Sequence, residues 1–384
     1  MSILSHEELL RRLVAIDSTS SLPNEPIADF IADYLDRPGI TVEKVSGGAE
    51  GKLNLLATIG EPDQSRVGLV LSGHMDAVPA NPHQWTTPPF EMQERDGNLY
   101  GRGTADMKAF LALSMNAAVE LVASPRPLVL LFTCDEEIGC LGAGHFVKNW
   151  PEHRPLPRSA IIGEPTRLRV VRMHKGHLKL RITLKGKGAH SGYPHLGRNA
   201  IEKAGPVIGA LSKLRTSLES ERYPSSVYFD DAPFVPLNLG TIHGGSAINI
   251  VPDECVIEVG MRPLPGVESE ELGVRLREAI RATQPPDDWL VELISESPPL
   301  LLDEASEICR TMYGLVDQSG TASVSFASDA GWLQRLGIEC LLFGPGSIEV
   351  AHRPDEFIPR DEIDRGYEIL KQAIDYFCRS EVTR

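Results

Sequence analysis

The sequence has few basic residues for its length, and it has neither a long apolar run nor a targeting segment. Its 38 Lys and Arg residues are outnumbered by 53 Asp and Glu, which gives a net charge of -15, and so acidic a chain is not expected to bind nucleic acid. No apolar run approaches the roughly 20 residues that span a bilayer. Residues 1–8 lack the positively charged start and the apolar stretch of a secretory signal. We therefore expect a cytoplasmic protein with no membrane partner.

The cysteines offer no paired metal ligands. No two of them have the CxxC spacing of a structural zinc site, and their even number does not indicate a disulfide framework in a chain of this size. Most lie inside apolar segments, where buried, reduced thiols are expected. The six cysteines are at positions 134, 140, 255, 309, 340 and 378.

Residues 1–176 alternate between helix and strand patterns. The expected strands are short and apolar throughout, which is typical of a mostly parallel sheet with helices on both faces. In such sheets ligands gather beyond the carboxyl ends of the strands. The pattern predicts helices over residues 6–16, 25–35 and 107–122, and strands over residues 53–59, 67–71, 128–133 and 160–162.

The pattern changes over residues 177–296. Residues 178–185 alternate between apolar and polar side chains, as in a strand with one face in water. The expected order is strand, helix, strand, strand, helix, strand, which is typical of a ferredoxin-like α+β unit. These elements are predicted at residues 178–185, 199–214, 237–242, 256–262, 270–282 and 289–295.

Two domains are expected, because 384 residues exceed what one hydrophobic core usually holds. The α/β pattern resumes near Asp303, with a helix over 303–316, strands over 322–326 and 338–343, and a last helix over 361–377. We therefore predict a catalytic α/β domain formed by residues 1–176 and 297–384. Residues 177–296 would be an inserted lid or dimerisation domain.

Five acidic or histidine clusters are spread over the predicted catalytic domain. All but Asp106, which we expect to open a helix, follow a strand-like segment, so their side chains could converge at one sheet edge. A two-metal hydrolase needs two terminal ligands per ion and a carboxylate that bridges ions about 3.5–4 Å apart. Taken singly, each cluster is also compatible with a solvated strand end. The clusters are His74 with Asp76, Asp106, Glu136 with Glu137, Glu164, and His352.

The clusters lie in motifs that resemble those of the M20 metallopeptidase family, and the resemblance covers nearly the whole chain. Residues 173–177, 261–266, 343–347 and 351–357 are most similar to the acetylornithine deacetylase branch of that family. Ser328-Asp329-Ala330 departs from the Thr-Glu-Ala of many members of that branch, which leaves the substrate side chain open. The motifs are Ser72-Gly73-His74-Met75-Asp76-Ala77-Val78-Pro79, Tyr100-Gly101-Arg102-Gly103-Thr104-Ala105-Asp106-Met107-Lys108, Cys134-Asp135-Glu136-Glu137, Gly163-Glu164-Pro165-Thr166, and His352.

The resemblance implies a site for two divalent metal ions. Asp106 would bridge the ions, with His74 and Glu164 completing one and Glu137 and His352 the other. Imidazole and carboxylate ligands suit zinc, and also cobalt or manganese. Zinc is the expected metal.

The resemblance also implies the catalytic groups. Glu136 is the expected general base, acting on a water that bridges the metals, because alternation along an extended chain turns Glu136 and Glu137 to opposite sides. Asp76 would hold the imidazole ring of His74 in place. His190 would stabilise the oxyanion, and in dimeric members of the family this histidine reaches into the partner subunit. We therefore expect a homodimer.

Three further residues are candidates for binding a small-molecule N-acyl amino acid. Arg262 and Asn249 would bind its α-carboxylate, since an arginine fork can grip a carboxylate through two parallel hydrogen bonds. Gly346 would add a backbone N–H. A surface salt bridge for Arg262 and a structural turn around Gly346 are the alternative interpretations.

These expectations describe a metal-dependent amide hydrolase that converts N2-acetyl-L-ornithine to L-ornithine and acetate in arginine biosynthesis. Alternatives within the family are succinyl-diaminopimelate desuccinylase, N-acetylcitrulline deacetylase, aminoacylase and dipeptidase. A non-catalytic metal-binding homologue is an alternative of another class. Loss of Glu136 or of a ligand would favour that alternative, and none is lost.

Overall fold

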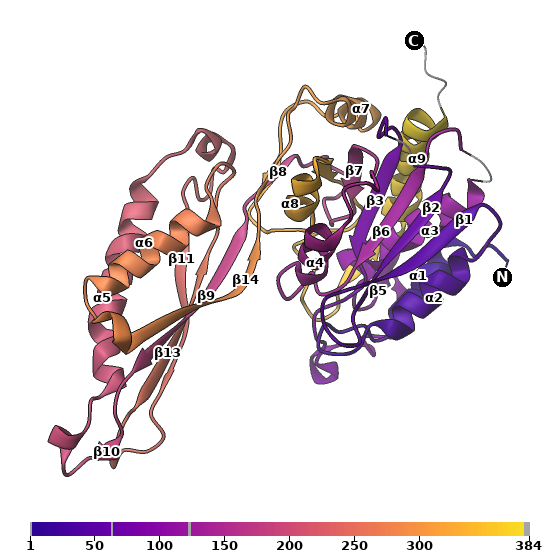
Figure 1. The fold of residues 1–384 in the computed structure, drawn as a ribbon. Coiled ribbons are helices and arrows are strands. Elements are labelled where there is room, and N and C mark those ends of the chain that lie inside the picture. The colour runs from indigo at the N-terminus through magenta and orange to yellow at the C-terminus, as the bar shows by residue number, and fades with distance from the viewer. Residues whose placement is uncertain (1, 63, 122–123, 380–384) are drawn as a thin grey trace. The chain divides into compact units, whose positions relative to one another are not determined.

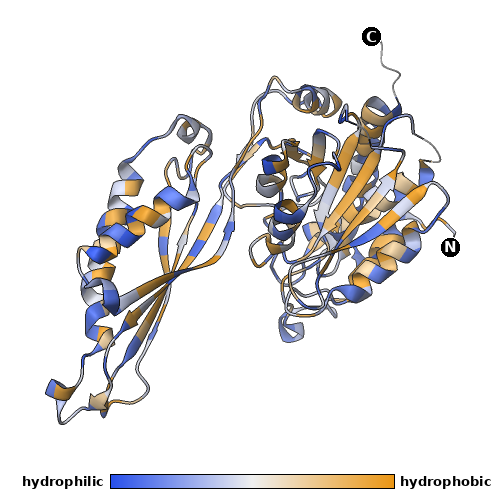
Figure 2. Cartoon of the chain, viewed as in Figure 1, coloured by the Kyte–Doolittle hydropathy of each residue, from blue (hydrophilic) through white to orange (hydrophobic). Residues whose placement is uncertain are grey.

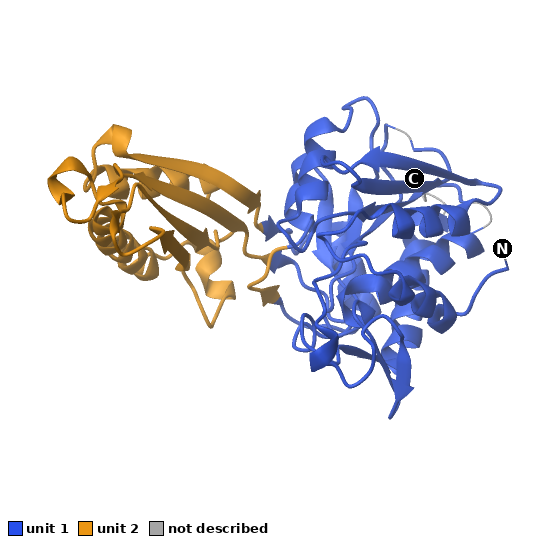
Figure 3. Cartoon of the chain, turned by 90° about the horizontal axis from the view of Figure 1, so that it is seen from below, with its two compact units in different colours: residues 1–173, 300–322, 328–384 blue, residues 174–299, 323–327 orange. Residues whose placement is uncertain are grey.

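The protein folds into two compact units, as seen in a computed structural model that describes residues 2–62, 64–121 and 124–379. Unit 1 comprises Met1–Met173, Leu300–Ala322 and Ser328–Arg384, and unit 2 comprises His174–Pro299 and Ser323–Ala327 (Figure 3). Residues 323–327 group with unit 2 although the sequence pattern placed them in the first domain. The reason is local pairing, because Lys175 N donates to Val324 O at 3.3 Å.

A six-stranded, mostly parallel sheet forms the centre of unit 1 (Figure 1). Its strand order is β1-β2-β6-β3-β7-β17. The pairs β6/β3, β3/β7 and β7/β17 are parallel, whereas β1/β2 and β2/β6 are antiparallel. The predicted mostly parallel sheet is confirmed. Its strands are β1 (Ile40–Ser46), β2 (Leu53–Ile59), β3 (Leu69–His74), β6 (Leu128–Thr133), β7 (Ser159–Ile162) and β17 (Glu339–Leu342).

Helices cover both faces of this sheet, as expected for short strands that are apolar throughout. On one side α1, α2, α3, α7 and α9 pack into one large apolar core with the strands. Across the sheet, α4 and α8 enclose a small separate cluster of Cys140, Ala143 and Trp332 (Figure 1). The helices are α1 (His6–Ala15), α2 (Glu25–Leu35), α3 (Ala109–Glu120), α4 (Leu141–Asn149), α7 (Glu307–Leu315), α8 (Ala330–Leu333) and α9 (Arg360–Ile374).

Apolar residues concentrate in the central strands, whereas the outer helices carry polar residues along their exposed faces (Figure 2). Helix α3 is an exception, because every residue from Ala109 to Ala118 is buried. Two smaller sheets have three strands each, in the orders β18-β5-β4 and β15-β8-β16. Their strands are β4 (Gln93–Arg95), β5 (Asn98–Tyr100), β18 (Phe357–Pro359), β8 (Met173–His174), β15 (Leu300–Leu301) and β16 (Ser323–Val324).

Unit 2 is a four-stranded antiparallel sheet with two helices. The strand order is β11-β13-β9-β14, and the chain order strand, helix, strand, strand, helix, strand is the predicted ferredoxin-like pattern. Strand β9 alternates between buried and more exposed residues. The elements are β9 (His177–Lys185), α5 (Ala200–Ser220), β11 (Leu237–Gly244), β13 (Glu254–Met261), α6 (Ser269–Arg281) and β14 (Trp289–Ser297), with a small pair β10 (Ala189–His190) and β12 (Ile250–Val251).

Two helices begin at least two residues later than predicted. The helix expected from residue 303 begins at Glu307, because the Ser306 hydroxyl caps it by accepting a hydrogen bond from Cys309 N. The helix expected from residue 107 begins at Ala109, and its expected last residue, Val122, lies outside the described residues. In the part of the chain that the structure describes, no helix is both long and apolar enough to cross a membrane.

Candidate metal centre

Three neighbouring strands bring three of the five predicted ligands, His74, Glu137 and Glu164, to one edge of the large sheet. Strands β6, β3 and β7 are adjacent and parallel, so their carboxyl ends meet. His74 is the last residue of β3 and pairs with Thr133 at the end of β6, three residues before Glu136. Glu164 follows β7 by two residues.

The predicted ligands form two groups that share Asp106. His74, Asp106 and Glu164 offer ligand atoms within 4.8 Å of one another, and so do Asp106, Glu137 and His352. Asp106 is the only member of both groups among the described residues. A carboxylate between two groups of donors is the arrangement that a bridging ligand requires.

Both histidine rings point at carboxylate oxygens. His74 Nε2 lies 2.9 Å from Asp106 Oδ1, and His352 Nε2 lies 3.2 Å from Asp106 Oδ2 and 2.9 Å from Glu137 Oε2. His74 Nδ1 lies 2.9 Å from the main-chain carbonyl of Asp76. Because a carbonyl only accepts, Nδ1 carries a proton, and a neutral ring then turns the Nε2 lone pair toward a second acceptor. A cation between nitrogen and carboxylate satisfies both.

The Asp76 side chain holds the backbone that carries Glu136 and Glu137 and does not hold the His74 ring directly. Its Oδ1 accepts from Glu136 N at 3.1 Å, and its Oδ2 accepts from Glu137 N at 3.3 Å and from the Ser20 hydroxyl at 2.7 Å. The distance from His74 Nδ1 to Asp76 Oδ1 is 3.7 Å. Asp76 therefore orients His74 through its main-chain carbonyl and the two glutamates through its carboxylate.

Asp106 was expected to open a helix, but it does not. It lies before α3 in a segment whose backbone angles at Asp106 and Met107 are not helical. The buried carboxylate of Glu356 holds this segment, because Oε1 accepts from Ala105 N at 2.8 Å and from Asp106 N at 3.0 Å. Glu356 Oε2 accepts from Arg102 Nη1 at 2.5 Å and from Gly103 N at 3.1 Å. Glu356 thus fixes the backbone from which Asp106 projects.

Burial and crowding of like charges shift the pKa values of the site. Burial raises the pKa of Glu136 and of Glu164 well above the usual range, and neighbouring carboxylates add to both shifts. The pKa of Glu137 is also raised, first by burial and then by Asp106. Hydrogen bonds to Asp106 and Glu137 raise the pKa of His352 to about 10. Divalent cations would relieve this repulsion, so the donor set fits a site for two metal ions.

Backbone geometry at Gly163 lets Glu164 approach this centre. An added Cβ on Gly163 would lie 1.9 Å from the Phe110 ring, which is buried on α3. Gly163 N donates to Ser72 O at 2.9 Å, which extends the β3/β7 pairing to the ligand-bearing turn. A larger residue at Gly163 would therefore push Glu164 away from its group.

The three predicted site residues of unit 2 are all exposed. His190 Nδ1 accepts a hydrogen bond from Gly192 N at 3.0 Å, so a neutral ring carries its proton on Nε2 and can donate it. Arg262 lines a pocket of about 320 Å³ on the sheet of this unit, together with Asn238 and Glu258. Asn249 accepts from Ser191 N through its main-chain carbonyl at 2.9 Å.

Gly346 has no N–H to spare for a substrate in this structure. Its N–H donates to Glu362 Oε2 at 2.7 Å, and the neighbouring Gly344 N donates to the Thr166 hydroxyl at 3.2 Å. Gly346 also has φ of 89° and packs against Ala105, where an added Cβ would lie 3.0 Å from Ala105 Cα. This geometry supports the structural turn that the sequence left open.

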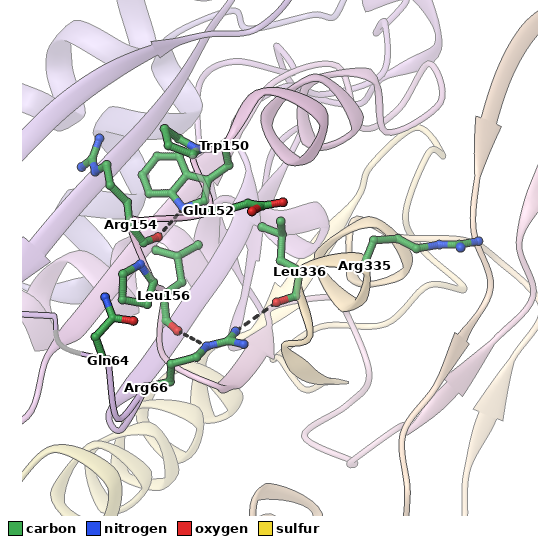
Figure 4. Close-up of a pocket in the computed structure, with 10 residues that line it drawn as sticks. Gln64, Arg66, Trp150, Glu152, Arg154, Leu156, Arg335 and Leu336 are labelled. Carbon is green, nitrogen blue, oxygen red and sulfur yellow. Dashed lines mark hydrogen bonds between the residues drawn. The ribbon is translucent and has the colours of Figure 1, made fainter.

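A separate pocket of about 340 Å³ lies elsewhere on unit 1 (Figure 4). Arg66 spans its floor, donating from Nε to Leu156 O at 2.9 Å and from Nη2 to Leu336 O at 3.1 Å. Arg154 lies over the Trp150 ring at 4.5 Å. None of the predicted site residues lines this pocket. The Nε and Nη2 donors of Arg66 bind main-chain carbonyls of residues that line the pocket.

Sequence reasoning gave no role to several residues that shape the centre. Arg102 lies in residues 100–108 and Glu356 in residues 351–357, and no local sequence pattern indicates that they pair across 254 positions. Asp329 is fully buried and accepts from the Thr133 hydroxyl at 2.5 Å. Only Asp329 gave a local signal, as a charged residue within the mostly apolar residues 326–333.

Comparisons with known proteins agree on one family. The model for peptidase family M20/M25/M40 matches residues 70–376. An acetylornithine deacetylase from Vibrio vulnificus is 36% identical, covering 98% of this chain and 100% of that protein. One from Photorhabdus laumondii is 37% identical, covering 97% of each. In structure, the M20 family metallo-carboxypeptidase Sso-CP2 from Sulfolobus solfataricus has a TM-score of 0.78 at 16% identity, covering 97% of this chain and 99% of that chain.

Proposed function

The chain belongs to peptidase family M20/M25/M40 and is a metallohydrolase that acts on amides, and we propose that it deacetylates N2-acetyl-L-ornithine to L-ornithine and acetate. The observation that carries this proposal is the pair of ligand groups that share Asp106. The relatives named acetylornithine deacetylase support the choice of substrate, since they match the chain over nearly its whole length. In this proposal the enzyme is cytoplasmic and serves arginine biosynthesis.

Two divalent ions, zinc before cobalt or manganese, would be held by the five predicted ligands. His74 and Glu164 would bind one ion, Glu137 and His352 the other, and Asp106 would bind both. When bound, such ions polarise an amide carbonyl and acidify a water molecule in the site. The nitrogen and oxygen donors, with no thiolate in either group, support this choice of metals.

Glu136 is proposed to act as general base and then as general acid. It takes a proton from the attacking water and delivers that proton to the leaving amine nitrogen. Its backbone N–H donates to Asp76 Oδ1, which fixes the backbone that carries the side chain just beyond the carboxyl end of β6. Burial raises its pKa well above the usual range, and a base with a raised pKa is better matched to proton transfer near neutral pH.

His190 is proposed to donate from Nε2 to the oxyanion that forms on the amide carbonyl, and to do so from the partner subunit of a homodimer. Support comes from unit 2 itself, where β11 is an edge strand and Ile242 on it is 50% exposed. Unpaired sheet edges with apolar residues are sites where a second chain can pair. Arg262, with Asn249, would bind the substrate carboxylate in the same proposal.

Mixing two variants of strongly reduced activity tests whether His190 acts across a dimer. Glu136→Ala lacks the base, and His190→Ala lacks the oxyanion donor. In a mixed dimer, one site combines an intact Glu136 with an intact His190 from the other subunit. Recovery of activity on mixing supports action across the dimer, and no recovery, with mixed dimers verified by mass, contradicts it.

A substrate panel tests the activity. The metal-loaded protein is offered N-acetylornithine, N-acetylcitrulline, N-succinyl-diaminopimelate, other N-acetyl amino acids and dipeptides, and release of free amine is measured. The proposal expects N-acetylornithine to have the highest kcat/KM. A higher kcat/KM for another substrate would support amide hydrolysis but contradict N-acetylornithine as the preferred substrate.

A further inference from the structure

A third group of possible ligands lies beside the two described above. Glu136, Cys140 and Asp329 each offer one ligand atom, and these atoms lie within 4.8 Å of one another. All three residues belong to unit 1, and none of them is among the five proposed metal ligands. The group therefore has no role in the proposed binding of the two catalytic ions.

A tight turn folds Cys140 back onto Glu136. Cys140 N donates to Glu136 O at 2.8 Å, and Cys140 has a positive φ of 54°. Its thiol reaches Glu136 Oε1 at 3.3 Å. Cys140 is 1% exposed, so its thiol lies inside the protein beside the Glu136 carboxylate.

Asp329 supplies a buried oxygen, Oδ1, that accepts no hydrogen bond from the residues that the structure describes. The residue is 1% exposed, and its Oδ2 accepts the hydrogen bond from the Thr133 hydroxyl. Its Oδ1 is buried and makes no hydrogen bond. A buried carboxylate oxygen without a partner is costly, since desolvation of the charge is not offset. This atom is available to bind a ligand. Because its neighbours in the group are a sulfur and a carboxylate oxygen, the ligand that fits is a cation.

We propose that Glu136, Cys140 and Asp329 form an additional site for Zn²⁺, distinct from the sites of the two catalytic ions, at which excess zinc inhibits the enzyme. One thiolate and two carboxylates are ligands that zinc accepts in a four-coordinate site, which leaves one position open. As the sulfur–zinc bond forms, the Cys140 thiol releases its proton to solvent. The inhibition, though not the binding, rests on the proposed function, because it removes Glu136 as the base.

Cobalt provides a readout that does not need activity. A thiolate bound to Co²⁺ gives a charge-transfer absorption in the near ultraviolet, whereas the five proposed catalytic ligands contain no sulfur. Protein already loaded with two equivalents of metal is titrated with further Co²⁺ and, separately, assayed with increasing Zn²⁺. The variants are Cys140→Ala and Asp329→Asn, and Cys134→Ala is the matched control because Cys134 is buried nearby but belongs to none of the three groups.

The proposal expects the charge-transfer band to appear beyond two equivalents in the wild type and in Cys134→Ala, and to be absent from Cys140→Ala. It also expects the zinc concentration for half inhibition to rise at least tenfold in Cys140→Ala and in Asp329→Asn. No band in the wild type, or a band that survives in Cys140→Ala, overturns the site. If Cys140→Ala does not fold, Asp329→Asn provides the test. The site predicts that the Co²⁺ concentration at which the band reaches half its height rises about tenfold in Asp329→Asn, and an unchanged concentration overturns the site.

The two proposals fail separately. A band without turnover of any substrate would contradict the proposed function and keep the metal site. Turnover of N-acetylornithine without a band, and with equal zinc inhibition in Cys140→Ala and Cys134→Ala, would contradict the metal site and keep the function.

Discussion

Replacing Glu356 by Gln should loosen the metal centre from a distance. Glu356 is fully buried and accepts four hydrogen bonds, from Arg102 and from the backbone N–H groups of Gly103, Ala105 and Asp106. A glutamine keeps the shape but removes the charge, and its NH₂ group must face either the guanidinium or two backbone donors. Removal of one partner from a buried ion pair costs about 3–5 kcal/mol.

The expected result for Glu356→Gln is therefore a loss of about 3–5 kcal/mol in the free energy of unfolding of the metal-free protein. Because Glu356 holds the backbone of Asp106, metal affinity should also fall by about 10- to 100-fold. Urea denaturation measures the first quantity, and competition with a chelator measures the second.

Glu94→Gln is the matched control. Glu94 also pairs with an arginine, Arg360, at 3.1 Å, but both side chains are about half exposed. Exposed ion pairs contribute about 0–1 kcal/mol, so this variant should leave stability and metal affinity nearly unchanged. If Glu356→Gln behaves like Glu94→Gln in both measurements, the role given to Glu356 is refuted.

Three more predictions test other parts of the structure. His190→Ala should lower kcat by an amount equivalent to about 3 kcal/mol, with unchanged metal content, because one oxyanion donor is lost; an unchanged kcat would contradict that role. Gly163→Ala should destabilise unit 1 by about 1–3 kcal/mol, because its Cβ would collide with the Phe110 ring; thermal unfolding that matches the wild type would argue against the close packing. Burial lowers the pKa of His174 to about 4 and that of His177 to about 3, so the unfolded chain, with pKa near 6.5, binds more protons as pH falls below about 6.5. The free energy of unfolding of unit 2 should therefore fall by about 1.4 kcal/mol per pH unit for each histidine between about pH 6 and pH 4. Hydrogen exchange of the β9 amides, corrected for intrinsic rates, measures this loss. Equal protection at pH 7 and pH 5 would contradict the prediction.

The strands of the large sheet could be predicted because they are apolar throughout. Residues 53–59 and 128–133 match β2 and β6 residue for residue. Strand β1 (Ile40–Ser46) was missed because it is an edge strand with polar residues at positions 41, 43, 44 and 46, and none of its residues is fully buried. Its pairing with β2 supplies order that its own composition does not indicate.

The identities of the candidate ligands could also be predicted, since each sits in a short motif at the end of a strand or loop. The residues that hold these ligands in place could not be predicted, because they come from distant parts of the chain. Glu356 reaches Asp106 across 250 positions, and Thr133 reaches Asp329 across 196. The Asp76 carboxylate was assigned to His74 by proximity in sequence, whereas the fold gives it to the backbone of Glu136 and Glu137. Such contacts depend on strand order, which the local pattern does not fix.

The most direct test of the central claim is the release of free amine from N-acetylornithine by metal-loaded wild type and by Glu136→Ala, with metal content measured in both. We predict turnover by the wild type that a chelator abolishes, and a drop of about 10²- to 10⁴-fold in Glu136→Ala with the same metal content. No release of amine from this or any other amide by the metal-loaded wild type, or equal turnover by Glu136→Ala, would contradict the claim.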